Sequence, residues 1–318
     1  MKNSNLLKIQ FASLQMISSL AAWGGAAWTK VPTNSSASSC PSCYIPVPAY
    51  ALPDGTQVPA FCVMKYEAKQ STTAYGDRNI GGSGGALPVS TSAGTPWVNL
   101  TWQDARSACA ATGSQLITED QWLSLAHQVT SVASNWSGGA VGSGYVYSGH
   151  NDNSPANALA ASDDSDGYFG TGNTSGNQRR TLTLPNGQMI WDLAGNVWEW
   201  VDATIAAASR YHGGASQVMS YNTSDGFSVA SSVPVAKRPQ NNWNASQGMG
   251  RYYDGYSLAG AFNSYNESPE NCADYCTPTA VFLRGGAWVG GAHAGAFSLY
   301  LNYGRSAAGI GSGFRCTR

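Results

Sequence analysis

The chain has little charge of either sign. Only 11% of its 318 residues are charged, and 17 basic residues face 18 acidic ones. Soluble domains typically contain about 25% charged residues. Because there is no basic surplus to neutralise phosphates, the composition argues against nucleic-acid binding. The surface must rely on Asn, Ser, Thr, Gly and Tyr, a mixture that suits an extracellular, cell-surface or virion-exposed binding protein.

A run long and apolar enough to span a membrane is also lacking. The best candidate, residues 11–28, is interrupted by Gln15 and by several Ser and Gly residues. It could be the core of a signal peptide, or a docking or oligomerisation segment, in which case a homo-oligomer is one expectation. A linker-like stretch rich in Ser and Pro follows. We therefore expect an N-terminal segment over residues 1–45 and a folded domain over residues 46–318.

Aromatic residues, in contrast, are abundant, with 11 Trp and 16 Tyr to build a core. Two short helices are predicted. Thr101 can cap the first, with Asp104 in its first turn, and Thr118 forms a capping box with Gln121 for the second. Strands are predicted over residues 58–68 and around Trp198–Trp200, where apolar side chains alternate.

Two long stretches show no periodic pattern. Residues 204–280 are predicted to be an insertion rather than a separate domain. Residues 135–180 are polar and rich in Gly, and so long a loop needs something to hold it. Asp163, Asp164 and Asp166 cluster there, so a hard cation is one candidate. A solvated acidic turn is the other interpretation, and the sequence leaves both open.

Four segments in order resemble one known fold. They are FCVMKYEA, NLTWQDARSACAATGSQLITEDQWLSLA, IWDLAGNVWEW, and FLRGGAWVG with a closing SGFRC. Together they cover about residues 58–202 and 281–317, and they resemble the formylglycine-generating-enzyme type of C-type lectin fold. The resemblance implies an α+β domain with a small, twisted, mostly antiparallel sheet, two helices and long irregular loops.

The enzymes of this family resemble the chain in its fold motifs but differ from it in their reactive groups. Formylglycine-generating members carry two copper-binding cysteines between the RGG and GFR motifs. Here no cysteine lies between Gly286 and Phe314. The four histidines, His127, His150, His212 and His293, are scattered. We therefore expect a protein that is not an enzyme, with a formylglycine-generating-type oxidase and an undiversified surface lectin as alternatives.

The tail resembles the hypervariable segment of variable proteins from diversity-generating retroelements, which bind ligands in phage tail fibres or on cell surfaces. Adenine replacement in such systems turns AAC codons into NNC codons, which never encode Lys, Glu, Gln, Met or Trp. These five types make up 41 of the 318 residues, yet none occurs between Val289 and Ser312. The resemblance implies a variable region over about 288–314 and a protein or glycan partner on a host or target cell.

By this resemblance, nine positions would vary and face the ligand. Strand alternation would point Phe297, Leu299 and Leu301 inward, and Ser298, Tyr300 and Asn302 toward the ligand. Tyr is a rigid, amphipathic contact residue, so Tyr300 and Tyr303 are the expected anchors. The nine positions are Val289, Gly290, His293, Tyr300, Asn302, Tyr303, Ala307, Gly309 and Gly311.

Seven cysteines leave at least one unpaired within the chain. The resemblance implies a disulfide between Cys109 and Cys316. Cys62, within a predicted strand, is expected to be a buried free thiol. The other four form either one zinc site or two disulfides between the linker and the insertion: Cys40, Cys43, Cys272 and Cys276.

The resemblance also implies two calcium sites. All of the donors would be oxygen atoms, as Ca²⁺ requires. The alternative for Glu199 is a hydrogen bond to backbone. The first site would use the side chains of Asn157 and Asp166 with the carbonyls of Ala158 and Tyr168; the second would use the side chains of Asn196 and Glu199 with the carbonyls of Gly195 and Val197.

Overall fold

A computed structural model describes residues 39–53, 55–71, 86–176, 178–206, 252–253, 279–291, 294–300 and 303–318. All of these belong to one unit, Asn34–Arg318. Most of the predicted N-terminal segment (1–45) and insertion (204–280) lies outside the described residues. Within the described part, no helix is long and apolar enough to cross a membrane.

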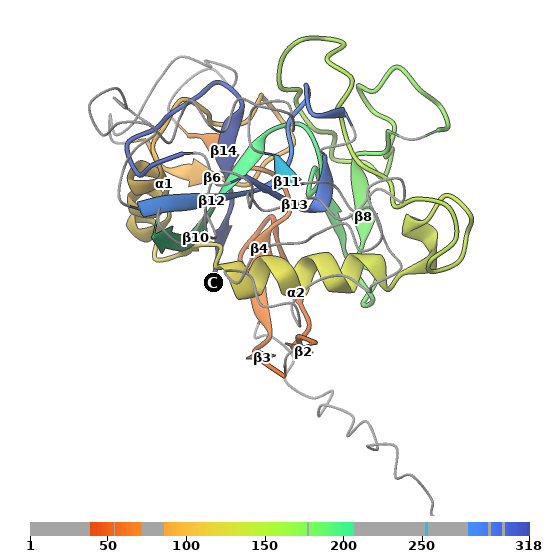
Figure 1. Ribbon diagram of the computed structural model, residues 1–318, viewed down its shortest axis with the longest axis horizontal. Coiled ribbons are helices and arrows are strands. Elements are labelled where there is room, and N and C mark those ends of the chain that lie inside the picture. The colour runs from red at the N-terminus through yellow and green to blue at the C-terminus, as the bar shows by residue number, and fades with distance from the viewer. Residues whose placement is uncertain are drawn as a thin grey trace, which may run out of the picture. The chain divides into compact units, whose positions relative to one another are not determined.

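Both predicted helices are present, each with a complete capping box. Thr101 caps α1 (Trp102–Ala111) with Asp104, and Thr118 caps α2 (Glu119–Thr130) with Gln121. α1 buries only one side, whereas α2 is buried continuously from its fourth residue onward. This follows from its position, because α2 contacts β10 and β13 on one side and the β2–β3 hairpin on another (Figure 1). A short 3₁₀ turn, η1 (Ala133–Asn135), follows it.

The larger sheet brings the sequence motifs side by side. Its strand order is β11-β13-β12-β10-β14. β12 is antiparallel to β10 and β13, while β14 is parallel to β10 and β11 is parallel to β13. The strands that carry RGG and GFR thus flank the strand that carries VWEW. The bounds are β10 (Trp198–Ala206), β11 (Tyr252–Tyr253), β12 (Thr279–Gly285), β13 (Gly295–Tyr300) and β14 (Ser312–Phe314).

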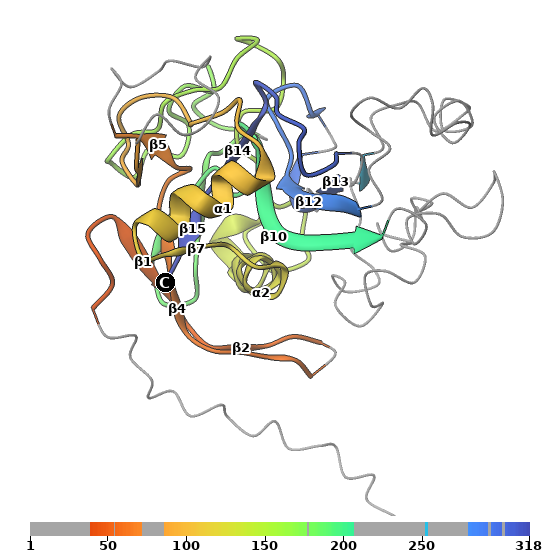
Figure 2. The ribbon, with the colours of Figure 1, turned by 90° about the vertical axis from the view of Figure 1, so that its left-hand side faces the viewer.

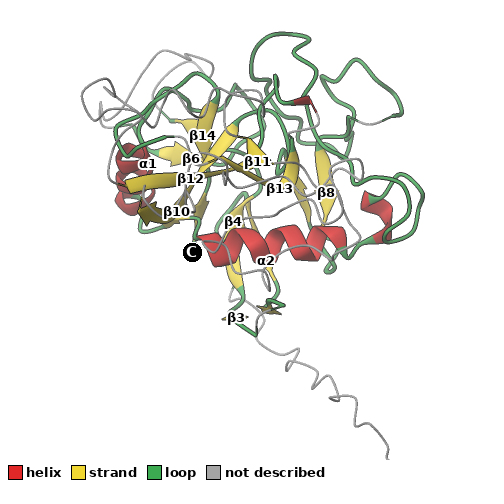
Figure 3. Cartoon of the chain, in the orientation of Figure 1, coloured by secondary structure: helices red, strands yellow, loops and turns green. Residues whose placement is uncertain are grey.

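The smaller sheet joins the two ends of the domain in the order β1-β4-β15-β7, and all of its pairings are antiparallel. Three two-stranded ribbons, β2–β3, β5–β6 and β8–β9, are also antiparallel. Loops fill much of the remainder (Figure 3). The predicted α+β lectin-like fold is therefore confirmed. The bounds are β1 (Tyr44–Val47), β2 (Tyr50–Ala51), β3 (Gln57–Val58), β4 (Phe61–Met64), β5 (Lys69–Gln70), β6 (Pro88–Val89), β7 (Gln115–Leu116), β8 (Thr181–Thr183), β9 (Met189–Trp191) and β15 (Cys316–Thr317).

The disulfides confirm one expectation and correct two. Cys109 in α1 is bonded to Cys316 in β15, which fixes the helix beside the smaller sheet (Figure 2). Cys62, predicted to be a free thiol, is instead bonded to Cys40. Strand register is not the reason, because β1 places Pro46 opposite Cys62. Cys40 lies just before a turn in which the Tyr44 amide donates to the Pro41 carbonyl at 3.0 Å, and its Cα is 5.6 Å from that of Cys62.

The pairing of Cys40 also removes it from the predicted zinc or linker–insertion set. Cys43 is exposed and not in a disulfide. Cys272 and Cys276 lie outside the described residues. A site made of all four cysteines therefore does not fit the structure.

Candidate ligand-binding surface

The segment between the RGG and GFR motifs is fixed at both ends by an arginine. Arg284, in β12, contacts Glu119 at the start of α2 through Nε at 3.2 Å and also through Nη2. Arg315, between β14 and β15, contacts Glu199 in β10 through Nε at 2.6 Å and also through Nη2. Bidentate arginine–carboxylate pairs impose a defined geometry. Both ends of the tail segment are therefore tied to the rigid part of the fold.

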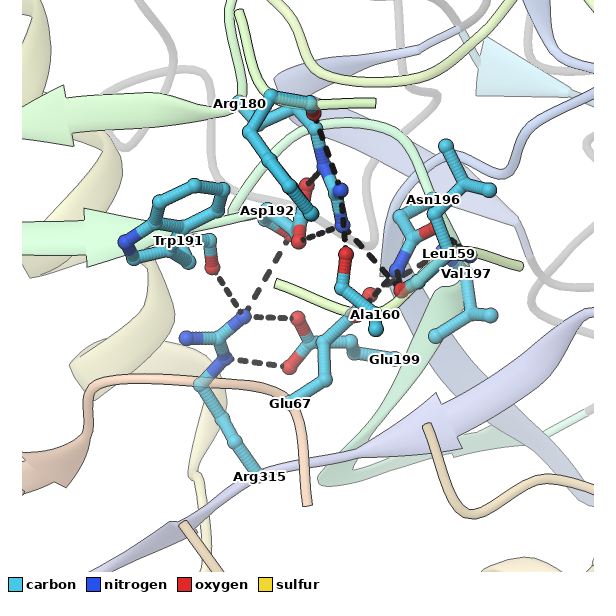
Figure 4. A network of polar contacts seen from close by, with 11 residues as sticks. Glu67, Leu159, Ala160, Arg180, Trp191, Asp192, Asn196, Val197, Glu199 and Arg315 are labelled. Carbon is cyan, nitrogen blue, oxygen red and sulfur yellow. Dashed lines mark hydrogen bonds and ion pairs between the residues drawn. The ribbon is translucent and has the colours of Figure 1, made fainter. Parts of the chain in front are cut away.

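Glu199 and Arg315 belong to a buried ionic network (Figure 4). Burial raises the pKa of the Glu199 carboxyl, and the Arg315 charge opposes that rise. Burial also raises the pKa of Glu67 well above its usual value and lowers the pKa of Lys69 to about 8. Such charges are tolerable only when paired and hydrogen-bonded. Arg180 is paired with Asp192 and Arg315 with Glu199. Glu67 accepts from the Asn196 side chain and from the Val197 amide. Lys69, also buried, adds a positive charge that acts on Glu67 and Asp192.

The GNVWEW motif supports the tail through its backbone. Gly195 and Asn196 both have positive φ, of 87° and 66°. The Asn196 side chain holds this turn, since Oδ1 accepts from the Leu159 amide at 2.8 Å and Nδ2 donates to Glu67. The Asn196 carbonyl then accepts from the Trp288 amide at 2.9 Å. A buried side-chain network thus positions the backbone where the variable region begins.

Two turns of the tail each expose one apolar side chain. Val289 is 64% exposed and Ile310 is 55% exposed. The buried Trp288 ring lies beneath, 3.6 Å from where a Cβ on Gly311 would stand. Ile310 was not among the nine predicted positions. The sequence could have indicated this exposure, because a large apolar residue between two glycines, Gly309 and Gly311, is difficult to bury.

The glycines among the nine positions fall into two kinds. A Cβ on Gly309 or Gly311 would make ordinary contacts, at 3.7 Å from the Tyr303 hydroxyl and 3.6 Å from Trp288. A Cβ on Gly290 would stand 2.9 Å from the Ala287 carbonyl oxygen, a distance that requires the backbone to shift. Gly309 and Gly311 therefore suit variable positions, whereas Gly290 does not.

Tyr300 does not face outward as predicted. It is 7% exposed and stacks on Trp198 at 5.5 Å between ring centroids. Every residue of β13 is buried, so Ser298 is covered as fully as Phe297. Strand alternation correctly placed Leu299 and Tyr300 on opposite faces of β13. The face that carries Tyr300 is covered by Trp198 and is not open to a ligand.

The remaining positions differ in exposure. Tyr303 is half-buried and packs against Tyr300 at 5.1 Å and Trp200 at 5.9 Å. Ala307 is buried at 7% exposure. His293 and Asn302 lie outside the described residues, as does Leu301. The predicted positions that are at least partly accessible in the described residues are therefore Val289, Gly290, Tyr303, Gly309 and Gly311, and Ile310 is exposed beside them in the chain.

The donors predicted for a calcium ion at Asn196 and Glu199 are already used. Both Glu199 oxygens contact Arg315, and the Asn196 side-chain oxygen accepts from the Leu159 amide. Ca²⁺ needs six to eight oxygen ligands, and a guanidinium in the same place repels it. The set Gly195, Asn196, Val197 and Glu199 therefore does not fit a calcium ion.

In the other predicted calcium set, Asn157, Ala158, Asp166 and Tyr168, the Asp166 side chain is already hydrogen-bonded within its own turn. Asp166 is exposed, and its Oδ1 accepts from the Tyr168 amide at 3.0 Å. Asp164 likewise accepts from the Asp166 amide at 2.7 Å. The acidic cluster thus caps its own turns. Within the described part of the chain, no three His, Cys, Asp or Glu side chains are grouped to hold a metal ion.

This geometry is that of a lectin-like domain whose C-terminal segment is held at both ends by arginine–carboxylate pairs and exposes side chains between them. The family model described as the sulfatase-modifying factor enzyme 1-like domain matches residues 56–318. The chain therefore belongs to this family. No curated protein matches the sequence significantly.

Several solved structures are similar in fold. Treponema denticola variable protein 1 is 13% identical, with a TM-score of 0.36 and coverage of 86% of this chain and 92% of its own. The Major Tropism Determinant U1 variant is 14% identical, with a TM-score of 0.34; the match covers 87% of this chain but only 55% of that one. PvdO from Pseudomonas aeruginosa is 14% identical, with a TM-score of 0.34 and coverages of 86% and 92%.

Proposed function

We propose that this chain is a non-enzymatic ligand-binding protein whose surface is formed by residues 288–314. The observation that carries the proposal is the contrast along this segment. Its flanking motifs are anchored by Arg284 and Arg315, while Val289 and Ile310 between them are more than half exposed. Exposed apolar side chains on a fixed backbone are typical of binding sites.

The chemistry of the surface favours a protein partner over a glycan. Among the described residues from 287 to 312, Arg305 is the only charged one, and its guanidinium lies over the Trp102 ring at 5.5 Å. Burying a Val or Ile side chain contributes roughly 1.5–3 kcal/mol. We therefore expect an apolar patch on a host or target-cell protein.

Diversification by a retroelement would explain why this segment lacks the five residue types that NNC codons cannot encode. A phage tail fibre or another virion or cell-surface protein is the proposed setting. The two disulfides favour an oxidising or extracellular location. Sequencing the neighbouring DNA tests the proposal. We expect a reverse transcriptase gene and a near-copy of the codons for residues 288–314 that differs only at adenines. If neither is present, the protein is an undiversified surface lectin.

Family membership keeps an oxidase as the competing function. Formylglycine-generating chemistry needs thiolates in the tail, and no cysteine lies between Gly286 and Phe314. A copper-dependent oxidase assay on a cysteine-containing peptide separates the two functions. Turnover above a no-protein control would favour the enzyme.

A further inference from the structure

Arg180 lies inside the long loop that connects η1 to β8, and every N–H of its guanidinium is used. Nε and Nη2 donate to the two Asp192 carboxylate oxygens at 2.8 and 2.7 Å. Nη1 donates to the carbonyls of Ala160 and Phe169 at 2.6 and 3.2 Å, and Nη2 also donates to Leu159 at 3.2 Å. A guanidinium has five N–H donors, so these five bonds satisfy it completely.

This arrangement lies in the same loop as the residues that the sequence suggested for a cation. The predicted calcium ligands Ala158 and Tyr168 are the chain neighbours of Leu159 and Phe169, whose carbonyls bind Arg180 (Figure 4 draws the Leu159 contact). Three backbone carbonyls and one carboxylate around a positive charge form an oxygen-rich shell of the kind that hard cations prefer. Arg180 is only 1% exposed, so it fills that shell itself.

The loop held by Arg180 also supports the first turn of the variable region. The Asn153 amide donates to the Trp288 carbonyl, and the Gly291 amide donates to the Asn151 carbonyl, both at 2.7 Å. Backbone hydrogen bonds of this kind fix a turn without restricting its side chains. The position of Val289, between them, therefore depends on where the loop lies.

We infer that Arg180 serves in place of a calcium ion as the central cation of the loop over residues 148–170, and thereby positions the turn around Val289. The stabilising role of Arg180 stands independently of ligand binding. Only its consequence for recognition rests on the proposed function, so the tests below need no ligand.

Thermal unfolding of the full chain, with a chelator and then with millimolar calcium, tests whether Arg180 serves in place of a calcium ion. We expect the same Tm in both conditions. A Tm that is several degrees higher with calcium than with the chelator would overturn the inference, because calcium would then hold part of the fold.

Substitution of the adjacent residues Arg179 and Arg180 tests whether the hydrogen bonds of Arg180 stabilise the loop. Arg179 is half-buried and donates to the Ser134 carbonyl at 2.9 Å, so Arg179→Gln is a matched control. Breaking a buried pair in a domain of this size should lower the Tm of Arg180→Gln by about 5–10 °C. The control should stay near the wild type. Equal melting of the two variants would contradict the role given to Arg180.

Arg180→Lys provides a second variant in case Arg180→Gln does not fold. It keeps the charge but offers three donors for five acceptors, so we expect a Tm between those of Arg180→Gln and the wild type, or simply below the wild type if Arg180→Gln does not fold. Wild-type stability of Arg180→Lys would show that charge alone is sufficient and would reject the five-bond geometry.

Hydrogen exchange detects the effect on the turn directly. The amides of Asn153 and Gly291 should exchange about tenfold faster in Arg180→Lys than in Arg179→Gln, while those of β4 stay protected. Unchanged exchange at both amides would remove the link between Arg180 and the variable surface.

Discussion

The ionic network around Asp192 and the apolar surface around Val289 are neighbours held by opposite means. In the network, charged side chains bond to one another and to backbone carbonyls, and little of them reaches water. On the surface, backbone hydrogen bonds hold the turns and the side chains project outward. Buried, paired charges can therefore fix a backbone while the exposed side chains beside it remain free to change.

The largest expected effect comes from breaking the network. Glu199→Gln leaves Arg315 without its carboxylate partner and should lower the free energy of unfolding by about 3–5 kcal/mol, measured by urea titration. Asp202→Asn is the control, because the Arg106–Asp202 pair (3.0 Å) is partly exposed. We expect about 0–1 kcal/mol there. Equal losses would mean that burial does not distinguish the two pairs.

Adding a methyl group at Gly290 should lower the free energy of unfolding by less than Glu199→Gln does. It should lower it by more than adding a methyl group at Gly309 or Gly311. Gly290→Ala should lower the free energy of unfolding by about 1–3 kcal/mol, because its Cβ meets the Ala287 carbonyl. Gly309→Ala and Gly311→Ala should stay within about 0.5 kcal/mol of the wild type. If Gly290→Ala is as harmless as these two, Gly290 belongs with the variable positions after all.

The burial of Lys69 should also make the free energy of unfolding depend on pH in alkaline solution. The pKa of Lys69 is lowered to about 8 in the folded chain by burial, against 10.5 for an ordinary lysine. Between these values the unfolded chain binds the proton and the folded chain does not, so Lys69 contributes stability that increases as pH rises. The wild type should gain about 1–3 kcal/mol relative to Lys69→Met between about pH 8 and 10 in urea titrations. Tyrosine titration cancels in that difference. A constant difference would show that Lys69 stays charged.

The smallest effect is expected on the surface itself. Val289→Asn and Ile310→Asn should each change the free energy of unfolding by no more than about 0.5 kcal/mol. The matched substitution Val197→Asn, at a fully buried position, should be strongly destabilising. A large loss from Val289→Asn would mean that the tail is part of the core and not a display surface.

The sequence predicted what depends on neighbours along the chain. Thr101 and Thr118 cap their helices with residues three positions away, so both helix starts could be derived. The role of Arg180 could not be predicted from the sequence. Its five acceptors come from three separate stretches of the chain and follow no periodicity. Cys62 is bonded to Cys40, which precedes a turn at the start of β1, and cysteine spacing alone does not reveal such a turn.

Tyr300 illustrates the remaining limit within the candidate site. Alternation placed it opposite Leu299, which is correct, but only the tertiary fold shows that Trp198 covers that face. The capping boxes and the family motifs were therefore enough for the frame. The exposed residues of the tail required knowledge of which side of each strand is packed.

The joining of β15 to β4 has a consequence for folding kinetics. Arg315 donates to the Met64 carbonyl across 251 positions of sequence, and Cys109 and Cys316 are 207 positions apart. Non-local contacts of this kind slow folding, because a long loop must close before they form. We therefore expect slow, late assembly of the smaller sheet. Sequence changes confined to exposed turns such as those at Val289 and Ile310 would leave that slow step, and hence the yield of folded protein, almost unaltered.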